Sequence, residues 1–521
     1  MLPILFSIIL HIVCKPSKDT SAGSSSDSIN RLRSREIFAV TDSAQKWEKA
    51  TPESQGIDLE YLVKMMEELH TNNRNINGIV IIRNGYLVFD AYRKPYSAEI
   101  PHVLYSCTKS VTSTLIGLAI ADGYIKGPEQ SLTDLLSPNS EKLKNILSPD
   151  LKLKHLLTMT TGLDDRDDFM SDDLCKLLRS DDPTYYTLNK KRVNKPGERF
   201  RYNTKVSYVL GTILREKTGM NVDTYAEKKL FKPLGISKYI WAVSPNGTVH
   251  AGGCSGGLRL TAKDFARFAL MVAQNGKWRG RQIVPTEWVK TATNAHIFTR
   301  GYPAYYGYQW WITHNKKITM AMGYGGQRAF IVPEEQLVVI FFSDLPPGLE
   351  RYPDEIFYQY IQKSLSLQAT PKNPEMNKRL EALVNSWEYK SEHRVTIPES
   401  VIPYLNKRYT FKKNDINLNA LELKYQDGLL SFLEVMNNKK YIYRIGIGKY
   451  LTTQIGDHCY AAAVLSSEPN KFRMRLFELG QLHRFDVIIV HFEKNSIEIS
   501  SKDFYGRVYT LKGRNTGKMT F

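Results

Sequence analysis

The chain has 521 residues, of which 42% are hydrophobic and 11% aromatic, and its formal net charge is +18 at pH 7. This length exceeds what one ordinary core supports, so we expect at least two folded units. The apolar content excludes a disordered chain. Lys and Arg are interspersed with acids, and no aromatic–basic RNA-binding pattern occurs, so we expect no nucleic-acid partner. The positive charge leaves attraction to anionic cell-envelope material open.

The chain begins with an apolar segment, residues 1–14, which resembles the hydrophobic part of an export signal although no Lys or Arg precedes it. Residues 15–45 are polar and Ser-rich, a composition typical of a flexible tether. We therefore expect an exported protein of the periplasm or cell envelope. Cys14 stands where a lipoprotein signal has its lipidated cysteine, but Val13 precedes it instead of a small residue. A lipid anchor to the membrane through Cys14 is thus an open alternative.

The remaining cysteines are scattered and form no C-x-x-C pair; they are Cys107, Cys175, Cys254 and Cys459. Their spacing predicts neither a zinc site nor a disulfide framework. We expect them to be buried as small apolar residues.

In chain order, the pattern first predicts a helix over residues 58–69, with Asp58 as its N-cap. Two β-rich runs then flank Asn84-Gly85, which predicts a hairpin over residues 79–89. A long apolar helix follows over 110–125, and residues 130–300 are mainly helical. A second hairpin over 330–342 and a helix over 354–365 complete this part. Two hairpins far apart in sequence, with helices between and after them, predict an α/β (α+β) fold with one sheet flanked by helices.

The composition of the sequence changes at residues 371–374, which are Pro and polar residues. Beyond residue 400, short alternating runs are separated by Gly, Asn and Asp, which is typical of a small antiparallel barrel or sandwich. We therefore predict a first domain over residues 46–368, a linker over 369–400 and an all-β, barrel-like domain over 401–521.

Ser106 and Lys109 are the first candidates for chemistry. A Ser and a Lys three residues apart on a helix share a face. Ser106 precedes the long apolar helix, so its hydroxyl would lie at a buried helix start beside a partly desolvated amine, which suits a nucleophile and its base. Ser43 and Lys46 match the same spacing but lie in the polar tether. The spacing alone favours the ordinary interpretation, in which Ser106 is merely an N-cap.

Two further segments have weaker signals. Tyr202 lies in a loop before a predicted helix and beside cations, where its phenol could exchange protons with a leaving group, although a packed aromatic is the ordinary interpretation. The Gly-rich run 323–327 leads into the second hairpin. Its glycines would let substrate approach the backbone, whose N–H groups could stabilise an oxyanion, but a plain turn fits equally well.

Taken in order, Ser-x-x-Lys, Tyr-x-Thr and a Gly-rich strand resemble the serine β-lactamase and penicillin-binding-protein superfamily. The similarity is greatest to the class C β-lactamase-related group, which includes esterases, D-amino-acid peptidases and 6-aminohexanoate-dimer hydrolases. Further segments over residues 45–368 are similar to that group: HLLTMTTGL at 155–163, LGTILREKTG at 210–219, GGLRLTAKDFARF at 256–268 and YGYQW at 306–310. The resemblance implies a β-lactamase/transpeptidase-like antiparallel sheet.

The resemblance also implies roles for individual residues. Ser106 would attack a carbonyl and form an acyl-enzyme, Lys109 would activate it, and Tyr202 would pass a proton to the leaving group. The N–H groups of Ser106 and Gln327 would form the oxyanion hole, with no metal or organic cofactor. The residues implied in substrate binding are Thr204, Tyr324, Gly325 and Gly326.

Two positions depart from the family pattern. Thr204 stands where β-lactamases of the family have Asn, and Tyr324 stands where they have a Lys that binds the substrate carboxylate. The side-chain direction of the nearby Arg328 is left open. We therefore expect a serine hydrolase acting on a small-molecule ester or small amide. The alternatives are a D,D-peptidase or penicillin-binding protein acting on peptides, a weak β-lactamase, and a non-catalytic protein that binds envelope material.

Overall fold

The computed structural model describes residues 31–36, 46–136, 140–164, 173, 176–177, 180–244, 247–253, 256–389, 395–414, 417–436, 439–456, 458–481, 485–503 and 508–518. The predicted export segment with Cys14 lies outside these residues, as do Ser43, Cys175 and Cys254. Export and lipid attachment therefore stay predictions. Among the helices in the described ranges, none is both long and apolar enough to cross a membrane.

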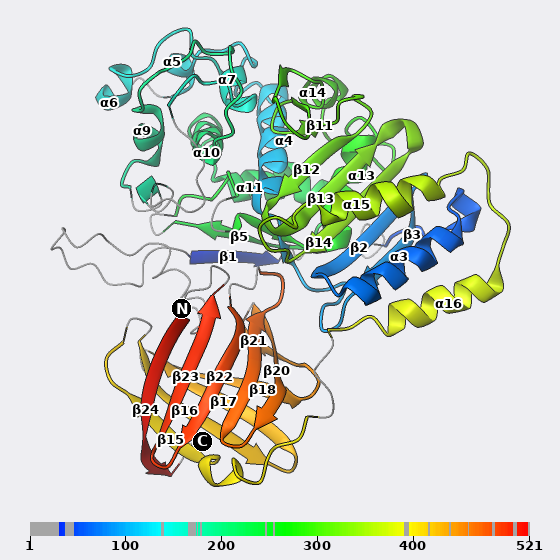
Figure 1. The fold of residues 1–521 in the computed structure, drawn as a ribbon. Coiled ribbons are helices and arrows are strands. Elements are labelled where there is room, and N and C mark those ends of the chain that lie inside the picture. The colour runs from blue at the N-terminus through cyan, green and yellow to red at the C-terminus, as the bar shows by residue number, and fades with distance from the viewer. Residues whose placement is uncertain are drawn as a thin grey trace. The chain divides into compact units, whose positions relative to one another are not determined.

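The chain forms two compact units (Figure 1). One comprises the described residues of Ser28–Tyr92 and Pro101–Ser386, and the other comprises those of Arg93–Ile100 and Trp387–Phe521. The chain thus enters the second unit briefly at Arg93 before it enters again at Trp387. The domain boundaries expected from the sequence do not include this early segment and stay predictions.

An eight-stranded antiparallel sheet forms the centre of the first unit. In spatial order its described strands are β3 (Tyr86–Tyr92), β2 (Ile76–Arg83), β14 (Leu337–Ser343), β13 (Gln327–Val332), β12 (Thr319–Gly323), β11 (Trp311–Ile312), β10 (Tyr305–Tyr306) and β9 (Ile297–Phe298). The predicted hairpin β2–β3 turns at Asn84 and Gly85, whose φ angles of 52° and 85° are both positive. Such a turn matches the twist of its strands, which explains the Asn-Gly sequence.

Helices cover both faces of this sheet, so the inner strands are apolar on both sides and β2, β13 and β14 are buried along their lengths. On one face, Phe265 of α13 (Ala262–Ala273) stacks on Phe342 with ring centroids 6.3 Å apart. On the other face, Phe357, just after α15 (Tyr352–Ile356), stacks on Phe330 at 4.1 Å. This arrangement confirms the predicted antiparallel sheet flanked by helices.

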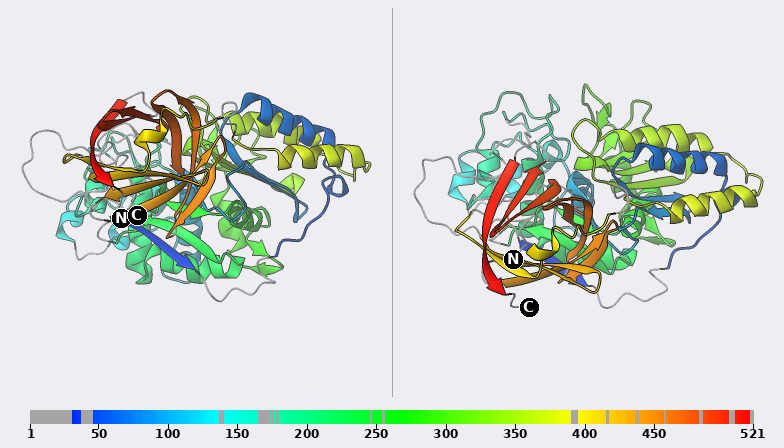
Figure 2. Two further views of the ribbon diagram at one scale, coloured as in Figure 1. Left: turned by 90° about the horizontal axis from the view of Figure 1, so that it is seen from below. Right: turned by 60° about the horizontal axis from the view of Figure 1, so that its bottom comes forward.

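Helix α3 (Leu59–Asn72) begins at the predicted N-cap Asp58, whose side chain accepts a hydrogen bond from the N–H of Glu60. It lies beside α16 (Pro374–Asn385), as both views in Figure 2 show. The His70 ring bonds to the carbonyl oxygen of Leu383 across this pair at 2.9 Å. The predicted linker 369–400 therefore contains a helix that packs on the first unit.

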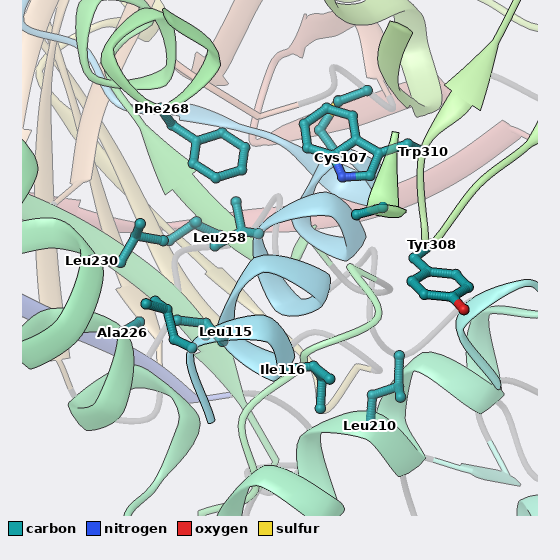
Figure 3. Close-up of a cluster of buried hydrophobic side chains, with 14 of the residues drawn as sticks. Cys107, Leu115, Ile116, Leu210, Ala226, Leu230, Leu258, Phe268, Tyr308 and Trp310 are labelled. Atoms are coloured by element: carbon teal, nitrogen blue, oxygen red, sulfur yellow. The ribbon is translucent and has the colours of Figure 1, made fainter. Parts of the chain in front are cut away.

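The long apolar helix of the sequence is α4 (Thr108–Ala121), and residues Thr108–Ala119 are buried along it. Figure 3 shows Leu115 and Ile116 of α4 among Leu210 of α10 (Thr204–Thr218), Leu258 and Leu230. Burial on all sides explains why α4 has hydrophobic and small residues around its whole circumference. The shorter helices of this unit are α5 (Leu132–Leu135), α6 (Glu141–Lys144), α7 (Leu153–Leu157), α9 (Pro183–Leu188), α11 (Val222–Ala226), α12 (Lys232–Leu234) and α14 (Thr286–Ala292).

A small second sheet lies in the same unit. Its order is β1 (Arg31–Glu36), β5 (Lys238–Val243), β6 (Leu258–Leu260) and β4 (His102–Val103), and β7 (Lys277–Trp278) pairs with β8 (Arg281–Gln282) elsewhere. Strand β4 leads directly into the turn that contains Ser106.

The described residues of the second unit form mainly strands, with a 3₁₀ turn at Ile402–Tyr404 before them. Its strands are β15 (Lys407–Phe411), β16 (Leu418–Gln426), β17 (Leu429–Met436), β18 (Lys439–Ile447), β19 (Leu451–Ile455), β20 (His458–Glu468), β21 (Lys471–Glu478), β22 (Phe485–Glu493), β23 (Ser496–Asp503) and β24 (Val508–Lys518). Neighbours pair antiparallel from β18 through β24 to β19, and a parallel pairing of Gly446 with Ala463 closes the ring between β18 and β20. Closure removes exposed strand edges, and it confirms the predicted barrel-like domain.

Candidate active site

Ser106 and Lys109 lie together at the start of α4. Ser106 belongs to the 3₁₀ turn Tyr105–Cys107 that precedes the helix, and Lys109 is buried with 1% of its surface exposed. The Lys109 Nζ donates a 2.8 Å hydrogen bond to the Ser106 Oγ. Tyr105 has a φ of 47°, a left-handed conformation that is strained for a residue with a side chain and is concentrated at functional sites.

Lys109 is held by two further acceptors. Its Nζ donates to the Thr204 Oγ1 at 3.0 Å and to the Gly252 carbonyl oxygen at 2.5 Å. An ammonium group has three N–H donors, so these bonds and the one to Ser106 satisfy it completely. In the neutral amine, two N–H groups suffice for Thr204 and Gly252, and the lone pair is then directed at the Ser106 hydroxyl. The site can therefore hold the lysine in both forms that proton transfer requires.

The N-terminus of α10 brings the Tyr-x-Thr motif, residues 202–204, to this lysine. Asn203 caps the helix by accepting a hydrogen bond from the N–H of Lys205, and Thr204 is the first helical residue. The preceding loop is fixed because the Arg201 N–H donates to the Met159 carbonyl at 2.9 Å. Tyr202 thus lies with its ring centroid 5.1 Å from the Lys109 Nζ. The hydroxyl of Tyr202 makes no hydrogen bond to any residue in the described ranges.

The Gly-rich run 323–327 packs against the turn that contains Ser106. A Cβ at Gly323 would come within 2.3 Å of the Leu104 carbonyl, and the Cys107 thiol lies 3.8 Å from the Gln327 carbonyl. Only glycine permits this approach. The Gln327 side chain points away from the turn, since it donates to the Ser343 carbonyl and accepts from the Ser343 N–H. The backbone of Gln327 therefore lies against the turn that contains Ser106.

The positions implied in substrate binding around Gln327 are differently exposed. Gly325 and Gly326 are buried and have φ angles of 75° and 89°, which glycine adopts without strain. Tyr324 is partly exposed, and its ring meets the Tyr105 ring edge-on at 5.9 Å.

Arg328 does not supply the cation that Tyr324 replaces. Its guanidinium pairs with Asp354 at 3.1 Å, and both side chains are 3% exposed. It also donates to the carbonyl oxygens of Gly323 and Glu350. These contacts hold the N-terminus of α15 on the sheet and leave Arg328 no access to a bound substrate.

Gly252 and Gly253 were not singled out by sequence reasoning. Gly253 has a φ of 79°, and a Cβ there would lie 2.1 Å from the Tyr105 carbonyl oxygen and 3.1 Å from the Ser106 nitrogen. This pair brings a carbonyl to Lys109 and supports the back of the Ser106 turn. A Gly-Gly pair shortly before a strand was the signal for such a close backbone approach.

Cys107 is adjacent to the candidate nucleophile but is unsuited to react. Burial raises the pKa of its thiol to about 12, so it carries no thiolate near neutral pH. Its role in the structure is packing between the Ser106 turn and strand β13.

Comparison with known proteins identifies the class. The family model described as Beta-lactamase matches residues 63–360, which is more than half of the chain, and the protein belongs to this family of β-lactamase-fold hydrolases. The matched range contains Ser106, Lys109, Tyr202 and the Gly-rich strand.

Individual relatives are distant. The 6-aminohexanoate-dimer hydrolase of Paenarthrobacter ureafaciens is 23% identical over 359 residues, which are 63% of this chain and 86% of the relative. A solved structure from Bacillus anthracis, described provisionally as a 6-aminohexanoate-dimer hydrolase, is 21% identical, with a TM-score of 0.52 over 67% of this chain and 93% of its own. EstCE1, a hydrolase with promiscuous acyltransferase activity, is 17% identical, with a TM-score of 0.47 over 58% of this chain and 99% of its own.

Proposed function

We propose that the protein is a serine hydrolase that acts through an acyl-enzyme on an ester or small amide. The observation that carries this proposal is the 2.8 Å hydrogen bond between Lys109 and Ser106, at a helix start where Thr204 and Gly252 hold the amine in place. A buried lysine next to a serine hydroxyl is the arrangement that converts a weak nucleophile into a reactive one.

In acylation, the Ser106 Oγ forms a bond to the substrate carbonyl carbon and its proton passes to the neutral Lys109 amine. The carbonyl oxygen becomes an oxyanion, for which we assign the backbone N–H groups of Ser106 and Gln327 as donors. The Tyr202 hydroxyl gives a proton to the leaving alkoxide or amine as its bond to carbon breaks. The Lys109 ammonium then returns its proton to the Tyr202 phenolate. Water adds to the acyl carbon and gives one proton to Lys109. The bond between that carbon and the Ser106 Oγ breaks, and the proton passes from Lys109 to the Ser106 Oγ as the acid is released.

We further propose that the favoured substrates carry no carboxylate beside the scissile bond. Tyr324 occupies the position implied in carboxylate binding, and Arg328 is committed to Asp354. The name of the Paenarthrobacter relative, a 6-aminohexanoate-dimer hydrolase, keeps small amides among the candidates beside esters. These points favour an esterase or amidase over a β-lactamase or D,D-peptidase.

The test is labelling of the purified protein with a fluorophosphonate probe, followed by turnover of p-nitrophenyl butyrate, nitrocefin and a D-Ala-D-Ala peptide. Ser106→Ala should abolish labelling and turnover. Ser113→Ala is the matched control, because Ser113 lies on α4 with a buried hydroxyl that has no hydrogen-bond partner among the described residues. Labelling of Ser106→Ala at the wild-type rate would refute the proposal, and failure of every probe on the wild-type protein would favour a binding protein.

A further inference from the structure

We propose that Trp311 is a positioning residue that orients Tyr202 for proton transfer to the leaving group. The inference rests on the proposed function, because it assigns Trp311 an effect through the proton donor of that reaction. Tyr202 lies in a loop, and the part of the chain described here offers its hydroxyl no hydrogen-bond partner. Contacts with the faces and edges of its ring must therefore set its orientation.

The Trp311 ring makes the stacked contact among those on the Tyr202 ring. Its indole stacks on the Tyr202 ring with centroids 5.6 Å apart and an interplanar angle of 20°. Tyr306 meets the Tyr202 ring edge-on at 6.5 Å, and the Lys109 Nζ lies 5.1 Å from its centroid. A stacked aromatic pair of this kind restricts ring rotation without consuming the hydroxyl. The proton-bearing oxygen stays available while its direction is fixed.

The indole is itself fixed, which a positioning residue requires. Trp311 pairs with Tyr306 on β10 and with Met320 on β12, so its backbone is part of the sheet. The Tyr306 ring meets it edge-on at 4.8 Å and the Phe200 ring at 5.8 Å. Phe200 belongs to the same loop as Tyr202, so the aromatic cluster joins the loop to the sheet.

Gln309, two residues before Trp311, connects this part of the chain to the helices around the site. Its side-chain amide donates to the carbonyl oxygens of Leu156 and Leu157 and accepts a 2.7 Å hydrogen bond from the Ser207 hydroxyl on α10. Its backbone carbonyl accepts from the Ser110 hydroxyl on α4 at 2.8 Å. The segment with Trp311 is thus held to both helices that position Lys109 and Thr204.

The role of Trp311 can be tested with two esters whose leaving groups differ in their need for a proton. The p-nitrophenolate anion departs without a proton, whereas an alkoxide requires one, so only the second reaction depends on the orientation of Tyr202. The two esters ethyl butyrate and p-nitrophenyl butyrate have the same acyl group. Trp311→Ala should lower kcat/KM for ethyl butyrate by about tenfold to hundredfold, because misplacing a catalytic group by about 1 Å costs about 100-fold. The kcat/KM for p-nitrophenyl butyrate should change less than about threefold. Trp311→Phe, which retains a stacking ring, should restore most of the loss.

A double-mutant cycle distinguishes this role from a direct contact with substrate. If Trp311 acts through Tyr202, then Trp311→Ala should cause no further loss in a Tyr202→Phe background. Tyr305→Ala is the control, because Tyr305 lies on the neighbouring strand with rings of Phe298 and His314 around it. Fluorophosphonate labelling of Trp311→Ala at the wild-type rate shows that Ser106 and Lys109 are intact.

Three results would overturn the inference: an equal loss on both esters, an undiminished loss in the Tyr202→Phe background, or a rise in KM with kcat unchanged. Each would make Trp311 a wall of the substrate site or a structural residue. Loss of labelling in the wild-type protein would instead overturn the proposed function itself, so the two failures are distinguishable.

Discussion

Two side chains explain why no cation stands at the position of the family's substrate-binding Lys. Tyr324 takes the position and packs its ring against Tyr105, while Arg328 is buried with Asp354. Neither arrangement is readable from sequence spacing, because the residue after Gln327 points to the opposite face of β13 and its partner comes from α15. The sequence showed which residue type was missing, and the structure shows that Arg328 does not replace it.

Tyr324→Lys should therefore increase activity on substrates that carry a carboxylate. A charged hydrogen bond is worth about 1.5–3 kcal/mol, so kcat/KM for p-nitrophenyl hydrogen glutarate should rise about tenfold or more relative to p-nitrophenyl butyrate. Tyr324→Met, which removes the ring without adding charge, is the control and should leave the ratio unchanged. An unchanged ratio in Tyr324→Lys as well would show that the substrate carboxyl end lies elsewhere.

At the scale of elements, the turn Gly252–Gly253 supports the site from a segment remote in sequence. Gly253→Ala should slow fluorophosphonate labelling of Ser106 by at least tenfold, because its Cβ would meet the Tyr105 carbonyl at 2.1 Å and shift the nucleophile. Gly219→Ala is a matched control: Gly219 has a similar φ of 69°, but a Cβ there has no neighbour within 4 Å. Backbone strain of about 1 kcal/mol should affect both variants, whereas only Gly253→Ala should lose labelling. Equal labelling of the two would remove the turn from the site.

Helix α7 gives the first unit a pH-dependent contact. The His155 Nδ1 accepts a 3.0 Å hydrogen bond from the Lys152 N–H at the start of α7, and burial, assisted by the Lys154 charge, lowers the pKa of His155 to about 4. Protonation destroys this acceptor. Because the unfolded pKa is near 6.5, the contribution of His155 is complete above about pH 6.5 and is lost as the pH falls toward 4.

The unfolding free energy should thus fall by about 2 kcal/mol between pH 7 and pH 4.5 from this residue. His155→Gln should be less stable at pH 7 and should have a shallower slope over that range, as measured by urea denaturation at each pH. An unchanged slope in the variant would assign the acid sensitivity to other groups.

At the scale of the whole molecule, local patterns predicted the elements, and non-local contacts decided their assembly. Asn84-Gly85 and Asp58 act within a few residues, so the hairpin β2–β3 and the start of α3 were predictable. The Ser106–Lys109 pair is likewise local. Gly252 reaches Lys109 across 143 residues and Thr204 across 95, and no periodicity encodes such contacts. For these, the family resemblance predicted Thr204 beside the site, and Gly252 required the structure.

Local patterns likewise did not predict that the early segment Arg93–Ile100 belongs to the second unit. Its contacts there lead to a test of that unit. The Tyr389 ring lies 3.9 Å from the Arg93 guanidinium and also contacts the rings of Tyr96, Tyr450 and Phe477. Backbone bonds join Lys94 to Trp387 and Tyr389. Tyr389→Ala should cost about 3 kcal/mol of stability and should raise amide exchange across residues 93–100, measured by hydrogen–deuterium exchange.

Leu429→Ala, at a side chain 52% exposed, is the control for that variant and should change stability by less than about 0.5 kcal/mol. Fluorophosphonate labelling of Ser106 should remain at the wild-type rate in Tyr389→Ala, because Ser106, Lys109, Thr204 and Gly252 all belong to the other unit. If residues 93–100 keep their protection in Tyr389→Ala, then this segment is held without the Tyr389 ring. In that case the early passage of the chain through the second unit depends on its backbone bonds and its other contacts.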